Sequence, residues 1–130
     1  MINQAQKDFW NGPAGAGWVS GQESMDRSLT GVTEALMRRA AVQPGERVID
    51  IGCGTGETNL LAASAAGKAG AVLGVDLSLP VSGLARDRAL AAGLANVSFM
   101  VGDAQTDKLL DDASLLLSRF GVMFFEDPQA

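Results

Sequence analysis

Three glycines and one acidic residue form the part of the chain best suited to bind a ligand. Asp50 is followed closely by Gly52, Gly54 and Gly56. A glycine cluster between a strand and a helix lets a ligand approach the backbone, and the first turn of that helix offers unpaired N–H groups. We therefore expect a small molecule to bind at this turn.

The residues that follow the glycines argue against a phosphate-containing ligand. The nicotinamide fingerprint ends in glycine or alanine, where this chain has Glu57 or Asn59, depending on the register. The Glu57 carboxylate would also repel a pyrophosphate. A Walker loop is excluded because no Gly-Lys-Ser/Thr sequence follows. The expected ligand lacks phosphates.

Short apolar runs alternating with helical stretches must position this turn. Four strands are predicted, at residues 47–51, 71–76, 97–101 and 113–120. Helices are predicted at residues 57–66, with Gly67 as the C-cap, and from Pro80 toward Asn96. Strands joined by helical stretches form βαβ units with right-handed crossovers. The fold class is therefore α/β, with a parallel sheet.

The N-terminal residues 1–24 are predicted to form a cap on the rest of the domain, residues 25–130. The segment is polar and glycine-rich, yet it holds Phe9, Trp10 and Trp18. Large aromatic residues so close to a terminus usually dock on another part of the protein. Trp18 would then either cover the ligand or pack on the sheet. An amphipathic helix with a core-facing stripe is predicted over residues 25–41.

Composition excludes several classes of function. The 130 residues suffice for one domain, and 47% apolar with 19% charged residues indicates a globular chain. The net charge of −5, without a basic run, disfavours nucleic-acid binding. Because the chain has no His and no Tyr, it cannot supply an imidazole base or a His-ligated zinc site. The acids Asp107, Asp111 and Asp112 are read as solvated, and no metal is predicted.

The single cysteine, Cys53, is predicted to be a small packed residue, because no His is present to activate it. It cannot form an internal disulfide, and residues 1–12 do not resemble a secretory leader. No apolar stretch reaches the length of a spanning helix. These features predict a cytoplasmic protein without a membrane partner.

The sequence Val-Ile-Asp-Ile-Gly-Cys-Gly-Thr-Gly at residues 48–56 resembles the first motif of class I S-adenosylmethionine-dependent methyltransferases. The resemblance continues, in order and spacing, through residues 74–78, 102–104 and 118–125. It covers residues 18–128 and is strongest to small-molecule methyltransferases of ubiquinone and menaquinone biosynthesis. It implies a Rossmann-like, mostly parallel sheet in the order 3-2-1-4 with helices on both faces. S-adenosylmethionine is the implied cofactor and a small molecule the implied acceptor.

The resemblance also implies which residues bind the cofactor. They are Asp50, Gly52, Cys53, Gly54, Asp76, Leu77, Asp103, Ala104, Ser118 and Trp18. Asp76 would accept hydrogen bonds from two ribose hydroxyls, as a carboxylate can with its two oxygens. Asp103 would accept from the adenine amino group, and the Ala104 N–H would meet the ring. The backbone of Ser118 would face the methionine end.

The acidic residues near the turn and the demands of methyl transfer both agree with S-adenosylmethionine as the ligand. Asp50 and Glu57 place negative charge near a cationic sulfonium and ammonium. Methyl transfer is an in-line displacement, so the main task of the protein is alignment, and no catalytic residue is assigned. Structural alternatives remain: the glycines as a plain turn, Asp76 as a helix cap and Asp103 as a turn residue.

The chain departs from the family pattern at its C-terminus. Family domains have seven strands in the order 3-2-1-4-5-7-6, and four are predicted here. The fourth strand becomes an apolar edge, which favours pairing with another chain. We therefore expect self-association through residues 114–125, or a fragment of a longer protein. The other functions considered are an inactive S-adenosylmethionine-binding or assembly module and, less favoured, a nicotinamide dehydrogenase.

Overall fold

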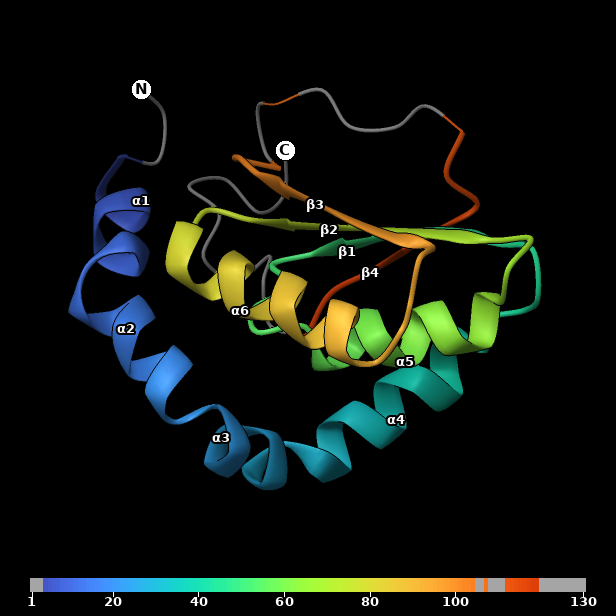
Figure 1. Ribbon diagram of the computed structural model, residues 1–130, viewed down its shortest axis with the longest axis horizontal. Coiled ribbons are helices and arrows are strands. Elements are labelled where there is room, and N and C mark those ends of the chain that lie inside the picture. Colours follow the sequence, from blue (N-terminus) through green and yellow to red (C-terminus); the bar gives the residue numbers. More distant parts are fainter. Residues whose placement is uncertain (1–3, 105–106, 108–111, 120–130) are drawn as a thin grey trace.

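A parallel four-stranded sheet with helices forms the body of the protein (Figure 1). The computed structural model describes residues 4–104, 107 and 112–119. The strands are β1 (Arg47–Ile51), β2 (Ala71–Asp76), β3 (Val97–Val101) and β4 (Leu115–Leu117), and the helices are α1 (Gln4–Asn11), α2 (Pro13–Ser20), α3 (Gln22–Ser28), α4 (Thr30–Ala40), α5 (Glu57–Ala66) and α6 (Leu79–Ala91). The order β3-β2-β1-β4, parallel throughout, confirms the predicted class and strand order.

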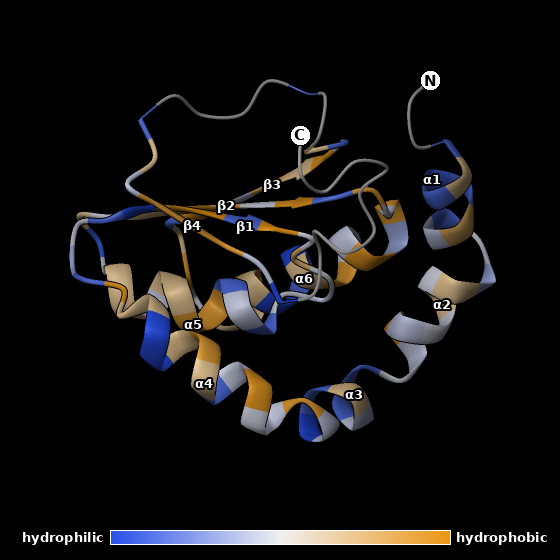
Figure 2. Cartoon of the chain, turned by 180° about the vertical axis from the view of Figure 1, so that it is seen from behind, coloured by the Kyte–Doolittle hydropathy of each residue, from blue (hydrophilic) through white to orange (hydrophobic). Residues whose placement is uncertain are grey.

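Helices α4, α5 and α6 lie on the same side of the sheet in both views of the chain (Figures 1 and 2). The steps from β1 to β2 and from β2 to β3 run in one direction, so right-handed crossovers place α5 and α6 on one face. The step from β3 to β4 runs the other way, and residues 105–106 and 108–111 of it lie outside the described residues. The prediction that helices also cover the second face of the sheet therefore stays a prediction.

The core lies between the central strands and α5. Its buried members are Val42, Val48, Ala62, Ala63, Ala66, Val72 and Leu117. The alanines of α5 let the helix approach strands β1 and β2 closely, and Gly67 ends the helix with a φ of 67°, as predicted. This tight packing fixes the start of α5, and with it the glycine loop.

The N-terminal region is more helical than predicted. Helices α1, α2 and the first half of α3 fall in residues 4–24, for which no helix was predicted. The single helix expected over residues 25–41 is divided at Leu29, which caps both α3 and α4. Its apolar stripe faces the core only in part, because Leu36 and Ala40 pack against the core while Val32 is 39% exposed. The buried residue of α4 is Thr33. Together the four helices form an arc around the end of α6 and the lower side of α5 (Figure 1).

Two element boundaries also differ from expectation. Helix α6 begins at Leu79, because Ser78 is the N-cap and accepts a hydrogen bond from Val81 N, and it ends at Ala91. Strand β4 is limited to Leu115–Leu117, shorter than the predicted run. The apolar residues 121–125 of the expected edge lie outside the described residues.

No helix in the part of the chain that the structure describes combines the length and apolarity needed to cross a membrane.

Candidate functional site

The loop between β1 and α5 turns through glycines in left-handed conformations. Gly54 has a φ of 58° and Gly56 a φ of 97°. A Cβ added to Gly54 would meet no atom of the structure within 4 Å, whereas one added to Gly56 would lie 2.9 Å from the Ala85 Cβ. Gly54 therefore borders open space where a ligand can approach, and Gly56 allows α5 to pack against α6.

Asp76 ties this loop to the carboxyl end of β2. Its Oδ2 accepts from Gly54 N at 2.9 Å, and its Oδ1 accepts from Ser78 N at 2.9 Å. Burial raises the pKa of the Asp76 carboxyl, while the N–H groups of Ser78, Gly54 and Leu77 oppose that shift. A carboxylate has about four acceptor positions, so capacity to accept from a ligand remains. The alternative role of helix N-cap belongs to Ser78.

Asp50 points under the loop toward α5. Its side chain is fully buried, and its Oδ2 accepts from Thr58 Oγ1 and from Asn59 Nδ2, the latter at 3.1 Å. Burial raises its pKa to about 7, against the opposing effects of the Thr58 hydrogen bond and the Arg119 charge. The geometry places Asp50 as a support of the loop whose charge reaches a ligand indirectly.

The buried Asp50 makes stability depend on pH. Its ordinary pKa is 3.8 and its folded pKa is about 7, so the folded state keeps a proton that the unfolded chain has already lost. The free energy of unfolding should therefore fall as the pH rises from about 4 to about 7. We expect the free energy of unfolding of Asp50→Asn to rise by ~4 kcal/mol relative to wild type between pH 4 and pH 8.

This pH effect is checked by urea unfolding of wild type and Asp50→Asn at several pH values. The exposed Asp87 of α6 provides the control, Asp87→Asn, which should follow wild type. A difference between wild type and Asp50→Asn that stays constant with pH would contradict the assignment.

Asp103 and Ala104 follow β3 at the same edge of the sheet. Gly102 N donates to Asp76 O at 2.9 Å, which joins the end of β3 to that of β2. Asp103 is 6% exposed, and its N–H donates to Asp107 Oδ2 at 2.9 Å. A turn with Asp107 N donating to Asp103 O at 2.7 Å encloses the half-buried Ala104. Asp103 is thus both part of a turn and close in the fold to Asp76.

The other expected residues surround the same loop. Ser118 Oγ donates to Ile51 O at 2.8 Å, which holds the end of β4 beside the start of the loop. Cys53 is 2% exposed, and burial raises its pKa well above the ordinary value. The thiol is packed, as predicted. Gly52 N donates to Val75 O at 2.7 Å, which places the loop over the end of β2.

Helices α1 and α2 dock next to Asp76. Asn11 Nδ2 donates to Leu77 O, and its Oδ1 accepts from Leu79 N, both at 2.8 Å. Ser78 Oγ donates to Trp10 O at 2.6 Å, and the ring of Trp18 packs edge-on against Trp10 with centroids 6.2 Å apart. The N-terminal aromatics were the sequence signal for this docking, and the role of Asn11 was missed.

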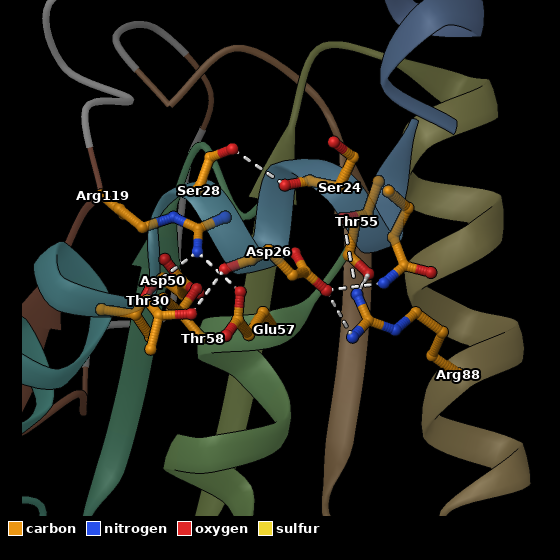
Figure 3. Close-up of polar contacts among 12 residues, drawn as sticks. Ser24, Asp26, Ser28, Thr30, Asp50, Thr55, Glu57, Thr58, Arg88 and Arg119 are labelled. Atoms are coloured by element: carbon orange, nitrogen blue, oxygen red, sulfur yellow. Dashed lines mark hydrogen bonds and ion pairs between the residues drawn. The ribbon is translucent and has the colours of Figure 1, made fainter. Parts of the chain in front are cut away.

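Two arginines that the sequence reasoning missed join the loop to α3 and α4 (Figure 3). Arg119 pairs with Glu57 at 3.0 Å and Arg88 with Asp26 at 2.9 Å. Burial raises the pKa of Glu57, Arg119 opposes the shift, and Asp26 adds to it. Glu57, which was expected to place negative charge near the ligand, is therefore also ion-paired with Arg119.

Comparison with known proteins points to one family. The family described as a methyltransferase domain matches residues 48–130. Aklanonic acid methyltransferase DauC of Streptomyces sp. (strain C5) is 36% identical over 104 residues, which cover 79% of this chain and 44% of DauC. Demethylmenaquinone methyltransferase of Geobacillus kaustophilus is 38% identical over 71 residues, 55% of this chain and 30% of that protein. The chain thus spans less than half the length of these relatives.

A solved structure supports the fold. The crystal structure of a putative S-adenosyl-L-methionine-dependent methyltransferase from Methanococcus maripaludis superposes with a TM-score of 0.68 at 22% identity. The match covers 84% of this chain and 52% of that one. At this identity, the similarity concerns the architecture of the sheet and its helices.

Proposed function

We propose that this chain, which belongs to the methyltransferase domain family, binds S-adenosylmethionine and takes part in methyl transfer to a small molecule. The observation that carries the proposal is the contact of Asp76 Oδ2 with Gly54 N at 2.9 Å. It brings a carboxylate able to accept ribose hydroxyls to a loop that borders open space. The names of the two relatives, which act on small molecules, support the acceptor class.

The residues present suit the chemistry of this ligand. Asp76 would hold the ribose, Asp103 and Ala104 the adenine, and the backbone near Ser118 the methionine end. The buried Asp50 Oδ1 has no hydrogen-bond partner among the described residues. Because burial raises the pKa of Asp50 to about 7, a cation bound nearby would favour its charged form. When bound, S-adenosylmethionine supplies a methyl group on a positively charged sulfur. The loop would align that sulfur with the acceptor.

Titration calorimetry with S-adenosylhomocysteine tests the proposal. We expect a dissociation constant on the order of micromolar for wild type, and no heat from NAD⁺. NAD⁺ binding without S-adenosylhomocysteine binding would instead favour a dehydrogenase. Transfer of a labelled methyl group to candidate acceptors such as aklanonic acid and demethylmenaquinone separates an enzyme from an inactive binding module, which would bind without turnover.

We further propose that the chain self-associates through strand β4. One side of β4 pairs with β1, and its other side has no strand partner in residues 4–104, 107 and 112–119. Leu116 is 60% exposed. An apolar edge of this kind is a template for a further strand. The remainder of the proposed edge, residues 120–125, lies outside the described residues.

Leu116→Lys is expected to convert wild-type oligomers to monomers, because a charge on the strand opposes edge pairing. Light scattering at high protein concentration should report a multiple of 13.4 kDa for wild type and about that mass for the variant. A monodisperse wild-type monomer would refute self-association.

We assign residues 1–24 as a cap segment, supported by the contacts of Asn11 and Trp10 with the turn after Asp76. A cytoplasmic location is supported by the lone Cys53, a buried free thiol.

A further inference from the structure

We infer that Arg88 and Arg119 are positioning residues that couple the docking of helices α3 and α4 to the conformation of the glycine loop. Bound S-adenosylmethionine and docked N-terminal helices would then stabilise each other. This inference rests on the proposed function and adds a coupling between the loop and a separate part of the chain.

Arg88 connects α6, the loop and α3. Its Nη1 donates to Thr55 O at 2.9 Å, and its Nη2 donates to Asp26 Oδ2 at 2.9 Å. The side chains of Arg88 and Asp26 are 22% and 14% exposed, so solvent screens this pair only in part. Gln22 Nε2 also donates to Asp26 Oδ2, at 2.6 Å, which fixes the carboxylate within α3.

Arg119 makes the same kind of connection from the end of β4. Its Nη1 donates to Glu57 Oε2 at 3.0 Å and to Thr33 Oγ1 at 2.8 Å. Its side chain is only 6% exposed, and Thr33 of α4 is 2% exposed. Glu57 is the first residue of α5, directly after the loop.

Each arginine thus holds one residue of the loop region and one residue of the N-terminal helices. Thr55 lies between the two glycines Gly54 and Gly56, and Gly54 N is the donor to Asp76. Movement of α3 or α4 away from the sheet would release Arg88 and Arg119, and with them the restraint on Thr55 and Glu57. A rigid guanidinium fork can hold two partners at once, as this arrangement requires. By linkage, a ligand that restrains the loop must stabilise the docked helices equally.

The alternative is that the arginines only stabilise the fold. In that case, variants of their partners would lower the melting temperature without changing affinity for a ligand. Asp26→Asn and Thr33→Val separate the two cases, because both residues lie on the N-terminal helices and neither belongs to the expected ligand set. Thr33→Val keeps the buried shape and removes the hydroxyl. Glu23→Gln in α3 and Glu34→Gln in α4 are exposed controls.

The test is calorimetric titration of each folded variant with S-adenosylhomocysteine, below its melting temperature. We expect Asp26→Asn and Thr33→Val each to raise the dissociation constant about fivefold, with the controls within about twofold of wild type. Arg88→Gln should weaken binding similarly, and the double variant Asp26→Asn/Arg88→Gln no further, because both changes break one connection. Arg88→Lys should restore little of the affinity lost in Arg88→Gln, since a single ammonium does not hold both partners.

Hydrogen exchange of the α3 amides gives a second readout. S-adenosylhomocysteine should slow their exchange in wild type, and this protection should be reduced in Arg88→Gln. Unchanged dissociation constants in Asp26→Asn, Thr33→Val and Arg88→Gln would overturn the coupling and leave the proposed function intact. A wild type that binds no S-adenosylhomocysteine would overturn the proposed function, and the coupling with it.

Discussion

Asp76→Ala is expected to weaken S-adenosylhomocysteine binding about 100-fold, or ~2.7 kcal/mol. The variant loses the acceptor for two ribose hydroxyls and also the acceptor for Gly54 N and Ser78 N. The loop therefore loses its connection to β2 together with its ligand contacts. This effect should exceed that of any other single substitution in the site.

Titration calorimetry measures the effect, and circular dichroism confirms that the variant is folded. Asp87→Ala removes an exposed carboxylate from α6 and should bind like wild type. If Asp76→Ala binds within threefold of wild type, the carboxylate does not hold the ribose.

Gly56→Ala should lower the free energy of unfolding by about 3 kcal/mol. The new Cβ would lie 2.9 Å from the Ala85 Cβ and 3.1 Å from its Cα, and the φ of 97° is strained for any L side chain. Urea unfolding measures this loss. It reflects close packing of the start of α5 against α6 and does not depend on a ligand.

Gly54→Ala is the matched comparison, because it adds the same methyl group at another left-handed glycine of the loop. Its φ is 58°, and the added Cβ meets open space, so the loss of stability should be only about 1 kcal/mol. Gly54→Ala should reduce S-adenosylhomocysteine affinity more than Gly56→Ala does, since its methyl group enters the space expected for the ligand. Equal losses of stability in the two variants would contradict this division of roles.

The elements around the sheet could be predicted because local and long-range preferences agree there. The β-branched run at residues 47–51 and the Ala-rich stretch ended by Gly67 have the bounds observed for β1 and α5. The N-terminal helices were missed because residues 1–24 carry several glycines and polar residues without a clear helical period. Their docking uses tertiary contacts such as that of Ser78 Oγ with Trp10 O, which no local pattern reveals.

In the candidate site, the residues that topology places could be predicted, and the long-range ion pairs could not. Asp76 and Asp103 follow strands directly, so topology alone brings them to one edge of the sheet. The ion pairs of Arg88 and Arg119 join residues 62 positions apart, which no local pattern reveals. The ion pair of Glu57 with Arg119 was therefore missed. Asp50, a member of the expected ligand set, accepts hydrogen bonds from Thr58 and Asn59, and its contact with the ligand stays a prediction.

The most direct test of the central claim is a crystal structure of the chain grown with S-adenosylhomocysteine. We expect both ribose hydroxyls within hydrogen-bonding distance of Asp76, the adenine beside Asp103 and Ala104, and the sulfur above the Gly54 turn. A ligand bound elsewhere, or protein filling the space between Asp76 and Asp103, would contradict this assignment.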